Sequence, residues 1–287
     1  MSELATMVQV GFPTHNRWDE VRNTLERLAD AGLGGLRVLI VDDGSDQPCP
    51  FAPASICPRA ELRRYPEARG MVVRRNEIAR EMNAPYYLGL DDDSFPVSGS
   101  LDDAVHFAEG RDDLLSLAFP IFNPRLDAPQ VPSLADRPYA VRAFIGCGHL
   151  VRRDRFLALG GYSPVFAYFF EEWELAARGF VQGLRCVHYP GLQVHHRASN
   201  AWRDWNRMDF YGARNAVLWN DWYVPPGRRA VKQARALMAR MMLATRTGRT
   251  ASLSGFAAGM RERAAHRAHR RPMSAAQYAE WVGMPFS

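Results

Sequence analysis

The chain of 287 residues contains 36 Lys and Arg residues, but Lys232 is its only lysine. An excess of Arg over Lys is typical of a GC-rich genome and does not by itself indicate a nucleic-acid-binding surface. The formal net charge of +5 is also uneven. Twelve basic residues and one acid, Glu262, lie between Arg228 and Arg271, which leaves −6 for the rest of the chain. An acidic body with a basic tail argues against nucleic acid as a partner.

Closely spaced cysteines and long apolar runs are also absent. The four cysteines, Cys49, Cys57, Cys147 and Cys186, form no C-x-x-C pair or other close metal spacing, so we expect free thiols in a reducing compartment. No apolar run approaches the ~20 residues of a membrane span, and the N-terminus does not resemble a signal peptide. We therefore expect a cytoplasmic protein, with any membrane contact being peripheral and at the inner membrane face.

Short apolar, β-prone runs alternate with helical periodicity in the first part of the chain. The predicted strands are 7–12, 37–41, 86–90 and 114–119, and the predicted helices are 18–31 and 75–82. This alternation predicts an α/β fold with a mostly parallel sheet flanked by helices. In such a fold, functional groups gather beyond the carboxyl ends of the strands.

The later part of the chain is less regular. Residues 123–138 are rich in Pro, Asp and Arg and predict a loop, whereas 185–194 predict extended chain. We expect a short helix near 171–178 and a helical extension after residue 201. The extension carries an apolar stripe at helical spacing, formed by Val231, Ala234, Leu237, Met238, Met241 and Met242.

Three aspartates, Asp91, Asp92 and Asp93, directly follow the predicted strand 86–90. Residues i and i+2 of extended chain point to one side, so Asp91 and Asp93 can share a divalent cation while Asp92 points elsewhere. A cation would relieve the repulsion among adjacent carboxylates. The alternative is a solvated acidic turn or a helix N-cap, because Ser94 and Pro96 follow.

Two further clusters could carry chemistry. His195 and His196 end the extended run, and imidazole with carboxylates suits Mn²⁺ or a similar ion, although most histidines in such places are structural. Glu171, Glu172 and Glu174 begin a predicted helix, where carboxylates favour the helix dipole. In the apolar setting of the neighbouring aromatic residues, one of these carboxylates could act instead as a general base.

Taken in order, seven motifs resemble the successive signatures of family 2 glycosyltransferases of the GT-A fold, nearest to bacterial rhamnosyltransferase-like members. They are VGFPTHNR (10–17), VDDGS (41–45), RRN (74–76), LDDDS (90–94), GGY (160–162), EEWELxxR (171–178) and VHHRAS (194–199).

The resemblance implies a GT-A catalytic domain over 1–200, with a nucleotide-sugar half at 1–110 and an acceptor half at 111–200, followed by a helical C-terminal extension at 201–287. It implies an inverting hexosyl- or deoxyhexosyl-transferase. Such an enzyme would move a sugar from a UDP- or dTDP-sugar donor to a hydroxyl of a glycan, a glycolipid or a small-molecule acceptor.

The resemblance also implies which residues bind the donor and the metal. The donor-binding residues are Pro13, Thr14, Asn16, Arg17, Asp42, Asp43, Arg75, Asp91 and Asp92. Asp42 or Asp43 would accept hydrogen bonds from the base, and Asp91 would contact the ribose or reach the metal through water. Asp93 would hold Mn²⁺ or Mg²⁺ directly, with His196 or His195 completing the shell. The ion would neutralise charge that develops on the departing diphosphate.

The catalytic base departs from the family pattern. The family's acid pair is usually Glu-Asp, and its second member takes the proton of the acceptor hydroxyl. Here the second member is Glu172, which is one methylene longer, so Glu171 stays open as the alternative base. The implied reaction is a single inverting displacement, with the base and the leaving group on opposite faces of the sugar.

The expected acceptor side is less specific. Gly146 and Gly148 would let the backbone approach the donor or acceptor sugar closely. Trp173 would either stack on a sugar face or fill the core. Arg214 would contact the acceptor, and it belongs to a group that either frames the acceptor entrance or packs a junction: Trp202, Trp205, Tyr211, Arg214 and Trp219.

The basic tail has three interpretations. We favour a helical subdomain whose apolar stripe packs on the catalytic domain, because Met is a common core filler. The alternatives are a basic amphipathic surface, 228–271, that rests on an anionic membrane, and a homodimer that forms through the same stripe.

Three other functions share part of this pattern. A sugar nucleotidyltransferase generally has a Gly-rich phosphate loop and uses lysines on phosphates, but no such loop follows the first predicted strand, and Lys232 lies in the tail. A catalytically silent nucleotide-sugar or glycan-binding protein would keep the fold without the base. A metal phosphohydrolase would release phosphate instead of a nucleoside diphosphate.

Overall fold

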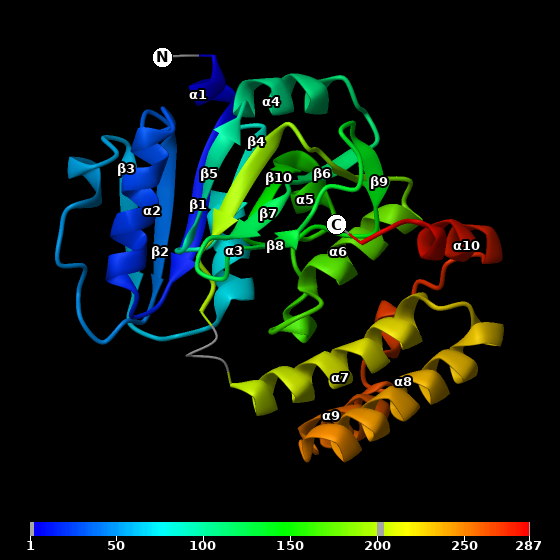
Figure 1. The fold of residues 1–287 in the computed structure, drawn as a ribbon. Coiled ribbons are helices and arrows are strands. Elements are labelled where there is room, and N and C mark those ends of the chain that lie inside the picture. Colours follow the sequence, from blue (N-terminus) through cyan, green and yellow to red (C-terminus); the bar gives the residue numbers. More distant parts are fainter. Residues whose placement is uncertain (1–2, 200–203, 287) are drawn as a thin grey trace.

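The structure is a computed structural model that describes residues 3–199 and 204–286 (Figure 1). Its strands are β1 (Val8–Thr14), β2 (Arg37–Asp43), β3 (Ala60–Tyr65), β4 (Tyr86–Leu90), β5 (Ser94–Gly99), β6 (Leu114–Ala118), β7 (Ile121–Asn123), β8 (Ala128–Val131), β9 (Tyr139–Val141), β10 (Gly148–Arg152), β11 (Arg185–His188) and β12 (Leu192–His196). Its α-helices are α1 (Leu4–Met7), α2 (Trp18–Asp30), α3 (Met71–Glu81), α4 (Leu101–Glu109), α5 (Arg153–Ala158), α6 (Glu171–Val181), α7 (Trp205–Tyr223), α8 (Pro226–Thr247), α9 (Ala251–Glu262) and α10 (Ala275–Gly283).

The main sheet has the order β3-β2-β1-β4-β10-β6-β11-β9. The four strands from β3 to β4 are parallel, β10 runs antiparallel between β4 and β6, and β11 is again parallel to β6. The chain leaves β1 toward β2 on one side and later returns to β4 on the other. The strand order therefore reverses at β1 and β4, which is where an open α/β sheet forms a crevice for a ligand.

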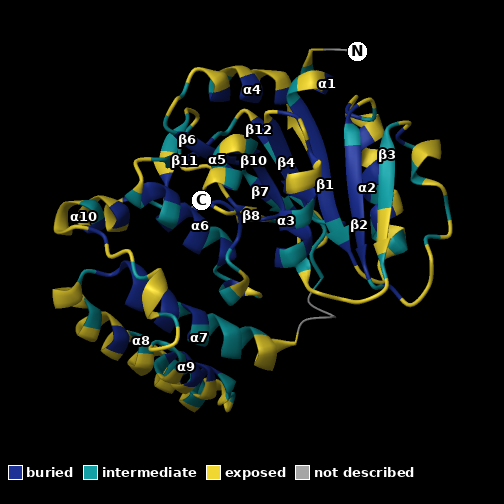
Figure 2. Cartoon of the chain, turned by 180° about the vertical axis from the view of Figure 1, so that it is seen from behind, coloured by how far each residue is buried: buried dark blue, intermediate teal, exposed yellow. Residues whose placement is uncertain are grey.

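Helices cover both faces of the main sheet. Successive residues of its central strands point to opposite faces and are apolar on both, so each face needs a layer that shields it from water. In β2, Val38 and Ile40 join the core that α2 and α4 cover, whereas Leu39 and Val41 join the core that contains side chains of α3, α5 and α6. Figure 2 shows the buried strands between these helices. The predicted α/β architecture, with its mostly parallel sheet and C-terminal helices, is confirmed.

A second, four-stranded sheet has the order β5-β12-β7-β8. Strand β5 begins directly after the three aspartates, and β12 pairs with it antiparallel, with His196 opposite Ser94. This pairing brings the end of β12 next to the end of β4, although about a hundred residues separate them in the sequence.

The C-terminal helices share a core with the rest of the molecule. Leu218, Trp219 and Trp222 of α7 belong to the same buried cluster as side chains of α3 and α6. Trp281 of α10 packs on Phe180 of α6, with the ring centroids 5.2 Å apart. The extension therefore shares the main core through α7 and α10, and a further small cluster of Ala213, Val217 and Phe256 joins α7 to α9. The predicted boundary between residues 200 and 201, and Trp202, lie outside the described residues.

The predicted packing of the apolar stripe is wrong. Helix α8 contacts α7 and α9 through the opposite side, on which Gln233 is buried and its amide donates to the carbonyl of Val217 at 2.9 Å. The stripe is left at the surface, where Met238 is 61% exposed and Met242 is 54% exposed.

Other differences lie in short strands. The predicted loop 123–138 contains β8, which pairs with β7. Strand β10 begins at Gly148, where no strand was predicted, and the extended run 185–194 is divided between β11 and β12. These strands are brief and owe their place to pairing with distant chain, which leaves little periodicity to read.

Within 3–199 and 204–286, none of the helices combines the length and apolar character needed to cross a membrane.

We expect the replacement of Trp222 by Ala to destabilise both parts of the molecule together. The Trp222 ring lies edge-on to Phe166 at 5.0 Å and stacks on His269 at 4.7 Å. Its removal should lower the free energy of unfolding by about 3–5 kcal/mol, measured by denaturant unfolding followed by circular dichroism.

The exposed Met238 provides the matched control, because its replacement by Ala should change the free energy of unfolding by less than about 0.5 kcal/mol. If Trp222→Ala released only the C-terminal helices and left the unfolding of the sheet unchanged, the shared core would be wrong.

Candidate active site

Polar residues beyond β1 and β4 meet at the point where the strand order reverses. Asp92 is buried there, and its carboxylate accepts a hydrogen bond from Thr14 Oγ1 at 2.7 Å. Arg17 spans two aspartates, with Nη1 2.7 Å from Asp92 Oδ1 and Nη2 2.5 Å from Asp93 Oδ2. A predicted contact of Asp92 with a donor would therefore have to act through Arg17.

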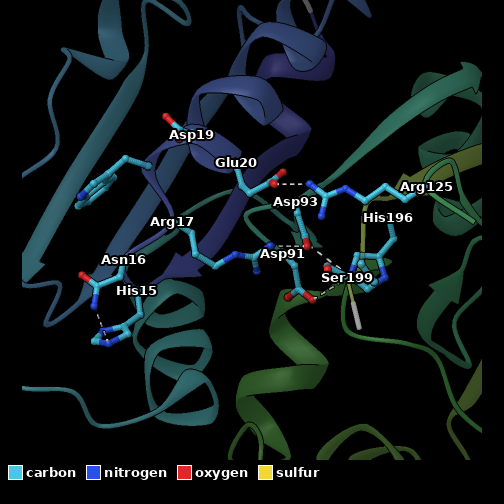
Figure 3. Close-up of a pocket in the computed structure, with 12 residues that line it drawn as sticks. His15, Asn16, Arg17, Asp19, Glu20, Asp91, Asp93, Arg125, His196 and Ser199 are labelled. Atoms are coloured by element: carbon cyan, nitrogen blue, oxygen red, sulfur yellow. Dashed lines mark hydrogen bonds and ion pairs between the residues drawn. The ribbon is translucent and has the colours of Figure 1, made fainter. Parts of the chain in front are cut away.

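Asp91, Asp93 and His196 converge on the other side of the motif (Figure 3). His196 Nε2 lies 3.3 Å from Asp93 Oδ1 and 4.0 Å from Asp91 Oδ2. Asp91, His196 and Cys147 each place one potential ligand atom within 4.8 Å of the others. Asp93 Oδ1 is buried, and its ion pair with His196 is the one contact that the described residues offer it. A cation that prefers oxygen and imidazole ligands fits this donor set.

The charges of this cluster compensate one another. Burial would raise the pKa of Asp93, but His196 and Arg17 outweigh it and lower the pKa to about 2. Burial would lower the pKa of His196, but Cys147, Asp93 and Asp91 outweigh it and raise the pKa. In Asp92 burial prevails over Arg17 and raises the pKa to about 7. Asp93 therefore holds its negative charge more firmly than its neighbour Asp92.

The choice between the two histidines is decided by strand alternation. His195 points to the opposite face of β12 from His196, and its ring lies between Phe95 and Phe122, with centroids at 6.1 and 5.5 Å. The alternative in which His195 completes the metal shell is therefore corrected, because its side chain is held away from the aspartates.

Arg75 connects the aspartates to the glutamate pair. Its side chain is 2% exposed, and one Nη donates to Asp91 Oδ1. The other Nη lies 3.5 Å from Glu171 Oε1 and 3.7 Å from Glu172 Oε1. Gly146 donates its backbone N–H to Glu172 Oε1 at 2.9 Å. A Cβ at Gly146 would lie 2.6 Å from that oxygen, so this close approach requires glycine.

The two glutamates differ in access. Glu171 is 1% exposed and its Oε2 makes no hydrogen bond, whereas the Glu172 side chain is 14% exposed. Burial raises the pKa of both carboxyls, although Arg75 favours their charged forms. A carboxylate with a raised pKa is a stronger base than an exposed one.

Side chains of α7 hold the loop before α6 in an unusual backbone conformation. Phe169 and Phe170 both have left-handed backbones, with φ of 64° and 71°. The buried Asn215 amide donates to the carbonyls of Tyr168 and Phe169, each at 2.8 Å. Arg214 Nη1 donates to the carbonyl of Val165 at 2.5 Å. These contacts stabilise a strained turn directly before Glu171 and Glu172.

The two aspartates at the end of β2 have different roles in the structure. Asp42 is fully buried and accepts from the Ser45 N–H at 2.9 Å. Asp43 accepts from the backbone N–H groups of Arg69 and Gly70 at 2.7 and 2.8 Å, and from Arg74 Nε at 2.6 Å. Asp43 therefore fixes the loop that leads into α3, and it lies nearer to open space than Asp42.

Two cavities adjoin these groups. The aspartate cavity has a volume of about 670 Å³ and is lined by His15, Asn16, Arg17, Trp18, Asp19, Glu20, Asp91, Asp93, Arg125, His196, Ala198 and Ser199. The Asp43 cavity has a volume of about 480 Å³ and is lined by His15, Asp43, Ala68, Arg69, Gly70, Val72, Val73, Pro164, Ala167 and Arg207. His15 lines both cavities, so they lie side by side.

Some of the predicted donor-binding residues line one of these two cavities, and others line neither. Asn16, Arg17 and Asp91 line the aspartate cavity, and Asp43 lines the other. The remaining ones, which line neither of the two, are Pro13, Thr14, Asp42, Arg75 and Asp92. Two of them contact the aspartate motif instead: Thr14 donates to Asp92, and Arg75 pairs with Asp91, which lines the aspartate cavity.

The structure does not gather the predicted acceptor residues around one cavity. Gly148 lies in β10, where a Cβ would contact Val194 at 3.3 Å, so it serves the packing of the two sheets. Trp173 lines a separate cavity of about 310 Å³ beside α8 and α10. Arg214 pairs with Glu262 of α9 at 2.5 Å and supports the loop before α6.

Sequence reasoning missed several residues of the site. His15 lies inside the VGFPTHNR motif, and Cys147 lies between the two glycines that were singled out, so both had a signal in the sequence. Arg125 had none. It lies within the predicted loop, yet it pairs with Glu20 at 2.5 Å across the aspartate cavity (Figure 3).

Solved structures place this architecture among glycosyltransferases of the GT-A fold. A structure of GalNAc-T7 with UDP, GalNAc and Mn²⁺ has a TM-score of 0.56 and 14% identity, over 75% of this chain and 51% of that one. The mannosyltransferase PcManGT from Pyrobaculum calidifontis, in complex with GDP-Man and Mn²⁺, has a TM-score of 0.57 and 18% identity, over 96% and 78%. S. aureus TarS has values of 0.56 and 13%, over 79% and 68%. The chain thus spans about half the length of GalNAc-T7, and identities this low show the fold alone.

The family follows from the sequence. Residues 10–174, more than half of the chain, match the model of glycosyl transferase family 2. The chain therefore belongs to glycosyl transferase family 2, as the order of its motifs indicated. No curated protein matches the sequence.

We expect the replacement of Asn215 by Ala to loosen the turn before α6. The loss of two buried hydrogen bonds should lower the free energy of unfolding by about 1–3 kcal/mol. It should also speed amide hydrogen exchange within 165–172, measured by mass spectrometry.

The control is Asn83→Ala, which removes an amide that contacts Gln9 far from this turn. Unchanged exchange within 165–172 in the Asn215 variant would contradict the positioning role of that side chain.

Proposed function

We propose that this glycosyltransferase is a metal-dependent, inverting enzyme that moves a hexose or deoxyhexose from a nucleoside-diphosphate donor to an acceptor hydroxyl. One observation carries the proposal. Arg75 forms an ion pair with Asp91, which together with His196 could bind a cation. Arg75 also lies near the partly desolvated carboxyls of Glu171 and Glu172. A displacement at a sugar carbon needs charge compensation at the leaving group and a base near the nucleophile, and these groups supply both.

The two adjoining cavities suggest where the parts of a nucleotide-sugar donor would bind. The Asp43 cavity, with apolar Val72 and Val73 on its wall, suits the nucleoside, and the aspartate cavity suits the diphosphate and sugar. Structural neighbours crystallised with UDP, GDP-Man and UDP-GlcNAc support a nucleotide-sugar donor of this size. We propose a UDP- or dTDP-sugar, in keeping with the rhamnosyltransferase-like resemblance.

Asp93, Asp91 and His196 would hold the divalent ion, and Cys147 places a further potential ligand atom beside those of Asp91 and His196. The buried Asp93 Oδ1 beside His196 and the converging ligand atoms of Asp91 and His196 fit Mn²⁺ or Mg²⁺, and Mn²⁺ accompanies the nucleotide in two of the neighbours. When bound, the ion supplies positive charge for the diphosphate leaving group. Arg17 and Arg75 keep the aspartate carboxylates oriented.

Glu172 is the base we propose. Its side chain is the more accessible of the pair, and Gly146 and Arg75 orient its carboxylate. As the acceptor oxygen forms its bond to the anomeric carbon, the bond from that carbon to the diphosphate oxygen breaks, and the hydroxyl proton passes to Glu172. Glu171, which is buried behind it, remains the alternative. The acceptor is a hydroxyl of a glycan, a glycolipid or a small molecule.

We expect Glu172→Gln to bind donor normally but to lose about 10²–10⁴-fold in kcat, because the amide cannot take a proton. Glu171→Gln is the matched control, with the same change one residue away. Donor affinity by calorimetry and turnover, measured by release of nucleoside diphosphate, separate binding from transfer. If Glu171→Gln alone abolished turnover, the assignment of the base would move to Glu171.

We also expect nucleotide sugars to stabilise the protein only when Mn²⁺ or Mg²⁺ is present. A thermal-shift panel should show a rise for UDP- or dTDP-sugars with metal, because a ligand that binds the folded state raises the midpoint. Asp93→Asn should remove the metal-dependent part of the rise. Indifference to every nucleotide sugar would refute the proposal.

Product analysis of the same nucleotide sugars, and of a nucleoside triphosphate with a sugar phosphate, distinguishes the other functions. Donor binding without turnover on any acceptor pool would favour a silent binding protein. Release of phosphate would favour a metal phosphohydrolase. Formation of pyrophosphate from a nucleoside triphosphate and a sugar phosphate would favour a nucleotidyltransferase.

A further inference from the structure

We infer that helix α8 is a docking surface for an anionic lipid bilayer. Its outward side is apolar, cations flank this side, and a cation-lined cavity suited to lipid headgroup phosphates lies beside it. The inference does not depend on transfer activity, and a binding measurement tests it directly.

The apolar part of the surface is the outward stripe of α8. Met238 is 61% exposed, Val231 55%, Met242 54%, Met241 53% and Leu237 36%. Figure 2 shows exposed residues along the outer side of this helix. Contiguous exposed apolar side chains mark an interaction surface, because their hydration is unfavourable. Methionine suits a fluid partner, since its unbranched side chain adapts to irregular surroundings.

The charge of α8 specifies the kind of partner. Helix α8 contains six cations and no acid. With 100° per residue, Arg228, Lys232, Arg235 and Arg246 fall along one flank of the stripe, and all four are exposed. An apolar stripe with cations at its border is the pattern of helices that lie in the plane of an anionic membrane interface.

A cavity of about 390 Å³ adjoins this flank, between α8 and α10. It is lined by Gly227, Arg228, Val231, Lys232, Arg235, Tyr278 and Val282, and none of these side chains is a carboxylate. Arg229, on the packed side of the helix, is paired with Asp221 at 3.8 Å. The cavity therefore offers three cations beside the exposed Val231 and Val282, an arrangement that matches a phosphate headgroup above its acyl chains.

A second copy of the chain fits this surface less well. In a two-fold dimer the same patch meets itself, so the flanking cations of one α8 would lie against those of the other. Such like-charge contacts are unfavourable without acids to separate them, and α8 has none. An anionic bilayer instead complements every cation on the flank.

Docking through α8 would also orient the proposed active site. Figure 1 shows that α8 lies on the far side of α7 from the sheets, and that β1 and β2 end toward the α7 side. The ends of these strands would then face the membrane side of the molecule, with α7 between them and α8.

The test is co-sedimentation of the full chain with vesicles. We expect binding to phosphatidylcholine vesicles that contain phosphatidylglycerol, loss of this binding at high sodium chloride, and no binding to phosphatidylcholine alone. The double variant Met238→Asp/Met242→Asp should bind about tenfold or more weakly, as should Lys232→Glu/Arg235→Glu. Because these side chains are exposed, the variants should keep the wild-type melting temperature.

Leu134→Asp is the matched control, because Leu134 is 67% exposed on the opposite, catalytic part of the chain. It should bind vesicles like the wild type. Equal binding to both kinds of vesicle, or none to either, would overturn the inference. A protein that sediments as a dimer, and becomes monomeric in the methionine variant, would assign the surface to a second copy instead.

Discussion

The burial of carboxyl groups beside arginines is the constraint on which the rest of this structure depends. Asp43, Asp92, Asp93 and Glu171 are each at most 7% exposed, and a buried carboxylate without a partner is strongly destabilising. Each is met by an arginine: Asp43 by Arg74, the pair Asp92 and Asp93 by Arg17, and Glu171 by Arg75. Arginine suits this task because its planar fork reaches two carboxylates at once, which a lysine ammonium does less well. Helix α3 supplies two of these arginines in succession and so connects the Asp43 loop with the aspartates and the glutamates.

The C-terminal helices extend this arrangement. Helix α7 contributes Trp219 and Trp222 to the core of the catalytic part, and its Asn215 holds the left-handed turn from which α6 begins. The geometry around Glu171 and Glu172 is therefore determined by two segments far apart in the sequence. In this fold the tail is a structural partner of the site, while its outermost helix remains available for another surface.

Much of the fold could be predicted from the sequence because its central strands are apolar and end in polar motifs. The strands that became β1, β2, β4 and β6, and the positions of Asp91 to Asp93, follow from that pattern alone. The short strands β7 to β10 could not be predicted, since they exist only through pairing with distant chain. For the same reason the ion pair of Arg125 with Glu20 had no local signal. The apolar stripe of α8 shows a further limit: periodicity identifies an apolar face but does not say what covers it.

The pairing of β12 with β5 has a consequence for how the chain tolerates insertions and deletions. The register of this pair shifts between Gln193 and Val194, where the opposite strand carries Pro96, which has no N–H to offer the ladder. Beyond the shift, the frame of the strand decides which imidazole faces Asp93. Insertion of one residue after the shift would not simply remove the proposed metal ligand, because it would move His195 into the position of His196, which faces the aspartates. A doubled histidine thus makes the site tolerant of an error in strand length that would silence a site with one.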